Sequence, residues 1–125
     1  MRTLYVTDDE PVAIRVMQRG LEREGFVVET FHNGRAVLDR IHDVAPDGLI
    51  SDIQMPVMDG KELCERIDVE FPNRRFPIFL ITSLTDVSHR HWSRRIDRLT
   101  FLEKPVSIKR LIDLLNVAIA KKADG

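Results

Sequence analysis

The sequence predicts an α/β domain: a doubly wound, five-stranded parallel sheet with five helices. Five short apolar runs alternate with five segments of helical pattern, and short connections join them without repeats or low-complexity linkers. The apolar runs are continuous, as expected for parallel strands that are buried on both faces. Because 125 residues suffice for one well-buried core, we expect a single domain over residues 1–125.

Composition narrows the class of protein. Hydrophobic residues make up 43% and charged residues 31% of the chain, which is ordinary for a soluble globular protein. The net charge of -1 gives no reason to expect direct binding to nucleic acid or to an anionic membrane. The single cysteine, Cys64, excludes an intramolecular disulfide and fits a reducing compartment. The chain has neither an apolar run long enough to span a membrane nor a signal-peptide pattern at its start, so we expect a cytoplasmic location.

The first half of the chain contains three predicted strands. The apolar run 4–6 ends at Thr7, the β-rich run 26–31 is followed by His32-Asn33-Gly34, and the run 47–52 ends in a carboxylate. Pro11 suits the first turn of a helix, and Gly25 and Pro46 end the two helical segments. Apolar residues repeat at helical spacing in these segments: Ala13, Val16, Met17, Gly20 and Leu21, then Val37, Leu38, Ile41, Val44 and Ala45.

The second half continues the alternation. A helical stripe over 63–71 precedes the apolar strand 76–81, which ends at Thr82-Ser83. A weakly patterned segment, about 86–95, is the fourth predicted helix. A fifth strand over 99–102 ends at Glu103-Lys104-Pro105, and the last helix carries a clear stripe of Ile108, Leu111, Ile112, Leu115, Ala118 and Ile119.

Polar side chains gather where the predicted strands end. Parallel strands all end at one edge of the sheet, and in such folds ligands bind there. The side chains expected at this edge are Asp8, Asp9, Asp52, Thr82, Ser83 and Lys104. Three carboxylates in close quarters require a bound cation or raised pKa values, and a set of oxygen ligands favours Mg²⁺ or Mn²⁺. With an added lysine and hydroxyl the set suits phosphoryl transfer, and Asp52, on the middle strand, is the best nucleophile candidate.

The motifs around these residues resemble the receiver domain of bacterial two-component response regulators, of the stand-alone, chemotaxis-regulator-like kind. The resemblance covers essentially the whole chain. It rests on Asp8-Asp9-Glu10-Pro11, on the run DIQMPVMDG at 52–60, on Ile81-Thr82-Ser83 and on Phe101-Leu102-Glu103-Lys104-Pro105, in that order at the strand ends. The resemblance implies a flavodoxin-like sheet with strand order 2-1-3-4-5.

The family assigns a role to each acidic residue. By resemblance, Asp52 accepts a phosphoryl group from the phosphohistidine of a sensor histidine kinase or phosphotransfer protein, in a reaction that requires Mg²⁺ or Mn²⁺. The metal ligands would be Asp9, Asp52 and the backbone carbonyl of Gln54, while Asp8 would act through a metal-bound water. Asp59 has another explanation: it stabilises the turn before Gly60.

The family also implies a conformational switch. Lys104 would pair with Asp52 or with the phosphoryl group, Thr82 would turn toward that group after transfer, and Phe101 would move inward with it. A cis Lys104-Pro105 peptide is part of the resemblance. The chain departs from the family pattern at Asp97-Arg98, where a Gly-Ala pair is frequent, and at Phe101, where tyrosine is frequent.

The basic segment 89–95 allows two interpretations. Trp92, the only tryptophan, and a nearby arginine could anchor a protein partner, in agreement with a family in which the region 86–119 meets the downstream effector. Alternatively, the segment is a solvated helix with Trp92 half-packed.

The sequence supports one leading function and two alternatives. The leading hypothesis is a phosphorelay signal-transduction switch, in which the domain contributes catalytic groups only to its own phosphorylation and dephosphorylation and is not an enzyme with turnover. One alternative is a pseudo-receiver that is never phosphorylated. The other is a metal-dependent phosphohydrolase, although Ile53 and Gln54 supply no general acid and no insertion is long enough for a cap. Whether the chain stands alone or precedes an effector domain is left open.

Overall fold

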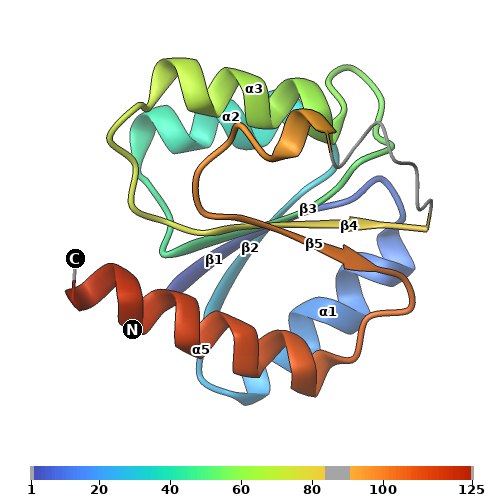
Figure 1. Ribbon diagram of the computed structural model, residues 1–125. Coiled ribbons are helices and arrows are strands. Elements are labelled where there is room, and N and C mark those ends of the chain that lie inside the picture. The colour runs from blue at the N-terminus through green and yellow to red at the C-terminus, as the bar shows by residue number, and fades with distance from the viewer. Residues whose placement is uncertain (1, 84–90, 125) are drawn as a thin grey trace.

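The computed structural model describes residues 2–83 and 91–124, with side chains as far as residue 120. Five parallel strands form one sheet in the order β2-β1-β3-β4-β5, which confirms the predicted order 2-1-3-4-5 (Figure 1). The strands are β1 (Thr3–Thr7), β2 (Val27–Phe31), β3 (Gly48–Asp52), β4 (Ile78–Thr82) and β5 (Leu99–Glu103).

Helices cover both faces of the sheet. Figure 1 shows α1 and α5 on one face and α2 and α3 on the other. Their bounds are α1 (Pro11–Arg23), α2 (Gly34–Asp43), α3 (Gly60–Glu70) and α5 (Ile108–Asp124). Of the predicted fourth helix over 86–95, residues 91–93 are helical, and 86–90 lie outside the described residues.

Local chemistry fixes where the helices begin. Pro11 occupies the first turn of α1, where its missing N–H costs nothing. The Asn33 side chain accepts a hydrogen bond of 2.9 Å from the N–H of Ala36 and caps α2. Asp59 caps α3 in the same way, accepting from the N–H of Glu62 at 2.8 Å. This cap confirms the structural explanation given for Asp59.

Strand ends differ from the predicted ones by one or two residues. The clearest case is β4, predicted over 76–81 and observed at Ile78–Thr82. Pro77 precedes it and has no N–H to donate to a neighbouring strand, so regular pairing begins at Ile78. The shift brings Thr82 into the last position of the strand.

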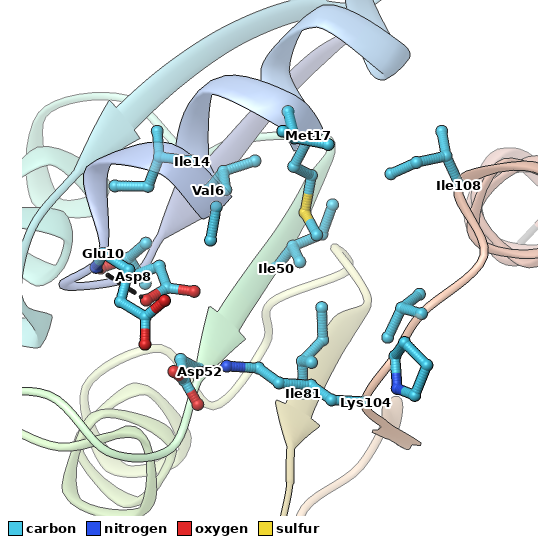
Figure 2. A pocket seen from close by; sticks show the side chains of 15 residues that line it. Val6, Asp8, Glu10, Ile14, Met17, Ile50, Asp52, Ile81, Lys104 and Ile108 are labelled. Atoms are coloured by element: carbon cyan, nitrogen blue, oxygen red, sulfur yellow. Dashed lines mark hydrogen bonds and ion pairs between the residues drawn. The ribbon is translucent and has the colours of Figure 1, made fainter.

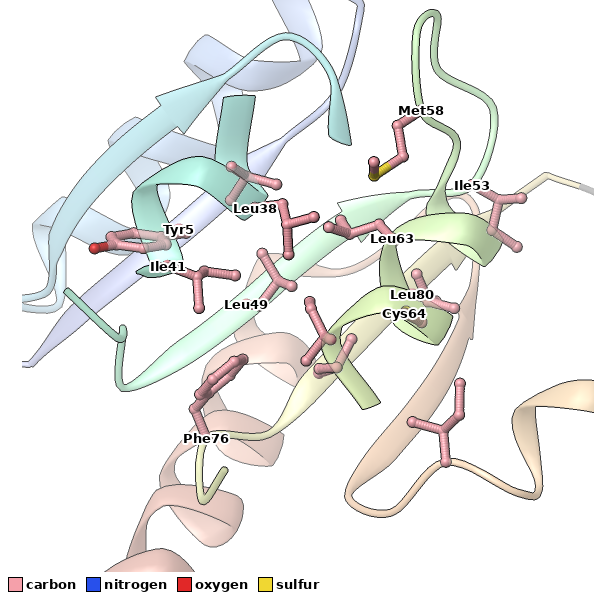
Figure 3. Close-up of a cluster of buried hydrophobic side chains, with 14 of the residues drawn as sticks. Tyr5, Leu38, Ile41, Leu49, Ile53, Met58, Leu63, Cys64, Phe76 and Leu80 are labelled. Carbon is pink, nitrogen blue, oxygen red and sulfur yellow. The ribbon is translucent and has the colours of Figure 1, made fainter. Parts of the chain in front are cut away.

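Two hydrophobic clusters fill the space between the sheet and its helices. The cluster under α2 and α3 includes Tyr5, Leu38, Ile41, Leu49, Leu63, Cys64, Ile67, Phe76 and Leu80 (Figure 3). The cluster under α1 and α5 includes Leu4, Val6, Leu21, Ile50, Phe79, Ile81, Leu111 and Leu115. Neighbouring residues of β3, such as Leu49 and Ile50, point to opposite clusters, and every residue of β3 is buried. Burial also raises the pKa of the Cys64 thiol, in agreement with its predicted place in the core.

The structure corrects both interpretations of Trp92. Its side chain is only 6% exposed and belongs to the cluster under α2 and α3, together with Ile96. Its ring also meets the ring of Phe101 edge to face, with centroids 6.3 Å apart. Trp92 is therefore neither half-packed nor available as an anchor for a partner in this conformation. The neighbouring Arg94 and Arg95 are exposed.

Across the described residues, none of the helices combines the length and apolar character needed to cross a membrane.

Candidate functional site

The register of the sheet brings the ends of four strands, β1, β3, β4 and β5, to one level. Thr7 of β1 pairs with Ser51 of β3, and Asp52 pairs with Ile81 of β4. Thr82 in turn pairs with Glu103 of β5. The residues that follow these pairs, Asp8 and Lys104, therefore emerge beside Asp52 at the carboxyl edge of the sheet.

The carboxylate of Asp52 is held on both oxygens. Its side chain is about 10% exposed, and Nζ of Lys104 lies 3.1 Å from Oδ2. The N–H of Ile53 donates to Oδ1 at 2.7 Å. One oxygen is thus fixed by the backbone and the other by a charge-assisted hydrogen bond, so the carboxylate has a defined orientation.

Two further carboxylates complete the cluster. Carboxylate oxygens of Asp8, Asp9 and Asp52 all lie within 4.8 Å of one another. Asp8 is buried and accepts a hydrogen bond of 3.0 Å from the N–H of Glu10, whereas Asp9 is exposed.

These neighbours shift the pKa values at the site. Burial, with the nearby charges of Asp52 and Asp9, raises the pKa of Asp8 despite the opposing effects of Glu10 and Lys104. Burial alone would lower the pKa of Lys104, but its hydrogen bond to Asp52 and the surrounding negative charge raise it overall. The site is therefore rich in negative charge that Lys104 compensates only in part.

The donor set fits a hard divalent cation. The three clustered side chains offer only oxygen atoms, the ligands that Mg²⁺ and Mn²⁺ prefer. A hollow beside them is lined by Asp9, Gln54 and Asp59 among others, so the predicted backbone ligand at Gln54 shares a surface with Asp9.

Close packing holds the loop after Asp52. A Cβ added to Gly60 would lie 2.5 Å from the carbonyl oxygen of Asp52 and 2.8 Å from Cα of Ile53, so only glycine fits. The N–H of Gly60 donates to the Ile53 carbonyl at 2.7 Å. Val57, at φ 68°, holds a left-handed conformation that β-branched residues rarely adopt. The predicted turn at Gly60 is thus also the support beneath Asp52.

The predicted switch residues lie on the two neighbouring strands. Thr82 is 4% exposed, and its carbonyl accepts from the N–H of Lys104 at 2.8 Å. Phe101 is half-buried beside Trp92, and Ser83 is exposed. The Lys104–Pro105 peptide is cis, as the resemblance implied.

Sequence reasoning missed an apolar cavity beside this edge. It has a volume of about 490 Å³ and opens between α1 and α5, next to Asp52 and Lys104 (Figure 2). No sequence signal identifies this cavity. Its size depends on the distance between α1 and α5, two helices that are separated by most of the chain.

Comparison with known proteins relates the chain to one family. The sequence profile described as response regulator receiver domain matches residues 4–116. The chain is 32% identical over 117 residues to the DNA-binding transcriptional regulator NtrC of Escherichia coli, covering 94% of this chain and 24% of that protein. It is 33% identical over 112 residues to the response regulator MprA of Mycobacterium avium, covering 90% of this chain and 48% of that protein. The chain thus spans about a quarter to a half of the length of these relatives.

Solved structures show the same architecture. The Vibrio cholerae chemotaxis protein CheY4 superposes with a TM-score of 0.85 at 25% identity, covering 94% of this chain and 98% of that one. A CheY-like response regulator receiver domain protein from Methanospirillum hungatei superposes with a TM-score of 0.90 at 21% identity, covering 99% of this chain and 98% of that one. The second likeness concerns the fold alone.

Proposed function

Because the chain belongs to the response regulator receiver domain family of two-component signalling, we propose that Asp52 is its phosphoacceptor. The phosphoryl donor would be a phosphohistidine on a sensor histidine kinase or phosphotransfer protein, and a cytoplasmic location is part of the same proposal. The observation that carries it is the contact between Asp52 and Lys104 inside the cluster of Asp8 and Asp9. A buried, oriented carboxylate beside one cation is what an aspartyl-phosphate requires.

The surroundings of Asp52 favour attack on phosphorus. The N–H of Ile53 holds Oδ1, and Oδ2 lies beside the ammonium of Lys104. A bond forms between a carboxylate oxygen and phosphorus as the bond from phosphorus to the imidazole nitrogen breaks. Lys104 is placed to compensate negative charge on the phosphoryl oxygens during that exchange.

The acidic residues would hold the metal. Asp9, Asp52 and the Gln54 carbonyl would bind Mg²⁺ or Mn²⁺, with Asp8 acting through a water molecule. When bound, the ion would neutralise part of the negative charge of the three carboxylates and the phosphoryl group. The raised pKa of Asp8 agrees with this assignment, because burial first, and then the charges of Asp52 and Asp9, disfavour its ionised form when no metal is bound.

Phosphorylation would act through Thr82 and Phe101. A phosphoryl group on Asp52 would draw the Thr82 hydroxyl toward it, and Phe101 would follow inward. The proposed effector surface over 86–119 includes β5 and the part of α5 from Ile108 to residue 119. Since Trp92 is buried, exposed neighbours such as Arg94 and Arg95 are the residues in reach of a partner.

The test compares the wild type with Asp52→Ala, each incubated with acetyl phosphate and Mg²⁺ and weighed by intact mass spectrometry. A gain of one phosphoryl group on the wild type alone is expected. No gain on either protein, with no response to beryllofluoride and Mg²⁺, would favour a pseudo-receiver. Steady turnover of a small phosphate ester by the wild type would favour a phosphohydrolase.

A further inference from the structure

The cavity between α1 and α5 is continuous with the acidic site. One end is bounded by Asp8, Glu10, Asp52 and Lys104, and the remainder is mainly apolar (Figure 2). Its apolar walls are Val6, Ala13, Ile14, Val16, Met17, Ile50, Ile81, Pro105, Val106 and Ile108. The sheet forms the floor, and the two helices form the sides.

The arrangement of the two helices gives the cavity its form. A Cβ added to Gly20 would lie 2.7 Å from Cγ2 of Ile108, so α1 and α5 touch there. The cavity lies between this contact and the carboxyl edge of the sheet, with Met17 and Ile108 labelled at the far side from Asp52 in Figure 2. The cavity therefore extends the Asp52 site toward the contact between α1 and α5. Its end beside Asp52 is polar, and its other end is apolar.

Its size and lining match those of small-molecule sites. Pockets that bind such ligands measure about 300–1,000 Å³, are largely apolar, and carry a few converging polar groups. The volume here is about 490 Å³, and the polar groups converge at one end only. A ligand that fills both ends has a charged head beside Lys104 and an aliphatic body between α1 and α5.

We propose that this cavity binds the aliphatic part of a small-molecule phosphoryl donor, so that the domain prefers acyl phosphates with extended chains over acetyl phosphate. The proposal rests on the proposed role of Asp52. The donor's phosphoryl group lies at the polar end, and its acyl chain lies among Ile14, Met17 and Ile108.

The chemistry balances without a further reactant. A carboxylate oxygen of Asp52 forms a bond to phosphorus, and the bond between phosphorus and the acyl oxygen breaks. The electron pair of that bond leaves on the fatty acid carboxylate, which needs no proton to depart. A weakly basic leaving group suits a site where Ile53 and Gln54 supply no general acid.

The test measures phosphorylation of the wild type by acetyl, butanoyl and hexanoyl phosphate at equal concentration with Mg²⁺, by intact mass. Burial of a methylene is worth about 0.8 kcal/mol, so the rate constant should rise about fourfold for each methylene that enters the cavity. Equal rates with all three donors would overturn this inference and leave the role of Asp52 intact. If none of the three acyl phosphates phosphorylated the wild type, both this inference and the proposed role of Asp52 would be overturned.

Variants distinguish the effect of the cavity on the phosphorylation rate from the intrinsic reactivity of each acyl phosphate. Ala13→Leu places a larger side chain into the cavity from α1, and the ratio of hexanoyl to acetyl rates should fall toward one. Val16→Phe, at an exposed position on the rim of the cavity, serves the same purpose if the first variant folds poorly. Val12→Leu enlarges an exposed residue of the same helix that does not line the cavity, so the ratio should stay at the wild-type value. An unchanged ratio in both cavity variants would contradict the proposal.

A binding measurement tests the cavity without phosphoryl transfer. Hexylphosphonate carries an anionic phosphorus head and a six-carbon chain, but its P–C bond cannot transfer the phosphorus group. Its addition should shift the methyl NMR signals of Ile14, Met17 and Ile108, whereas methylphosphonate should leave them in place. Equal effects of the two phosphonates would count against an apolar subsite.

Discussion

The ammonium of Lys104 lies 3.1 Å from Oδ2 of Asp52, although the two residues are 52 positions apart in the chain. The contact joins the end of β3 to the residue after β5, across the intervening β4. It means that the only cation in direct contact with Asp52 among the described residues already compensates that carboxylate before any phosphoryl group arrives. Under the proposed function, Lys104 would have two successive partners, first the free carboxylate of Asp52 and then the phosphoryl group.

Replacing Lys104 should have opposite effects on metal binding and on chemistry. In Lys104→Met the acidic site loses its compensating charge, so Mg²⁺ should bind more tightly by about 1 kcal/mol, a factor of about five. Phosphorylation by acetyl phosphate should slow by about 10²–10³ because a preorganised cation is missing. Calorimetric Mg²⁺ titration and intact mass measure the two effects. Lys104→Arg keeps the charge and is the control: its Mg²⁺ affinity should match the wild type, and tighter binding there would contradict the argument.

Asp8 should make the unfolding free energy of the metal-free protein depend on pH. The pKa of its buried carboxyl is raised above the ordinary value of 3.8, so the folded state favours the protonated form. The stability that this gives is present below pH 3.8 and is lost as the pH rises through the folded-state pKa. Asp8→Asn does not titrate, so it should exceed the wild type in unfolding free energy at pH 7 by about 1 kcal/mol.

Mg²⁺ provides the matching control for Asp8. Ligand at about 100 times its dissociation constant stabilises a protein by about 2.7 kcal/mol, and the wild type should gain this while Asp8→Asn gains less. Urea unfolding with and without Mg²⁺ measures both quantities. A metal-free wild type as stable as Asp8→Asn at neutral pH would show that burial and the neighbouring charges do not disfavour the ionised carboxylate of Asp8.

Gly60 should be essential for the position of Asp52. An added methyl group would lie 2.5 Å from the Asp52 carbonyl oxygen, and because the atoms it meets are backbone, the loop itself must shift. Gly60→Ala should cost about 1–3 kcal/mol in unfolding free energy and slow phosphorylation as well. Lys61→Ala, at the next and exposed position of α3, is the control and should change neither quantity. Normal phosphorylation by Gly60→Ala would show that the loop adjusts without moving Asp52.

Trp92 should report the switch directly. It is the only tryptophan, and its ring contacts that of Phe101 with centroids 6.3 Å apart. If Phe101 moves when Asp52 carries a phosphoryl group, beryllofluoride with Mg²⁺ should change the tryptophan fluorescence of the wild type. In Thr82→Ala the ligand should still bind, as shown by calorimetry, but the fluorescence should stay constant. A full fluorescence response from Thr82→Ala would show that Phe101 moves independently of Thr82.

The sheet and the placement of the acidic residues could be predicted from the sequence because both depend on local patterns. Apolar runs and helical stripes alternate, and right-handed crossovers then leave few ways to order the strands. Parallel strands end at one edge, so Asp8, Asp52 and Lys104 had to converge there. Their roles came instead from resemblance to a family, since three carboxylates and a lysine alone suit several reactions.

Features that depend on distances between remote elements could not be predicted. Trp92 lies in a segment without an apolar stripe, and its burial depends on space left above the sheet beside Leu80 and Ile96. The cavity depends on the contact between Gly20 and Ile108, which no local pattern encodes. The start of β4 moved for a local reason, Pro77, that strand periodicity alone does not include.

The hydrogen bond from the N–H of Lys104 to the carbonyl of Thr82, 2.8 Å long, joins the cation of the site to its proposed switch. A backbone shift at either residue displaces the other, because the peptide groups are locked together. If Thr82 turns toward a phosphoryl group on Asp52, as proposed, this bond carries the backbone movement of Thr82 to Lys104, the residue that pairs with Asp52.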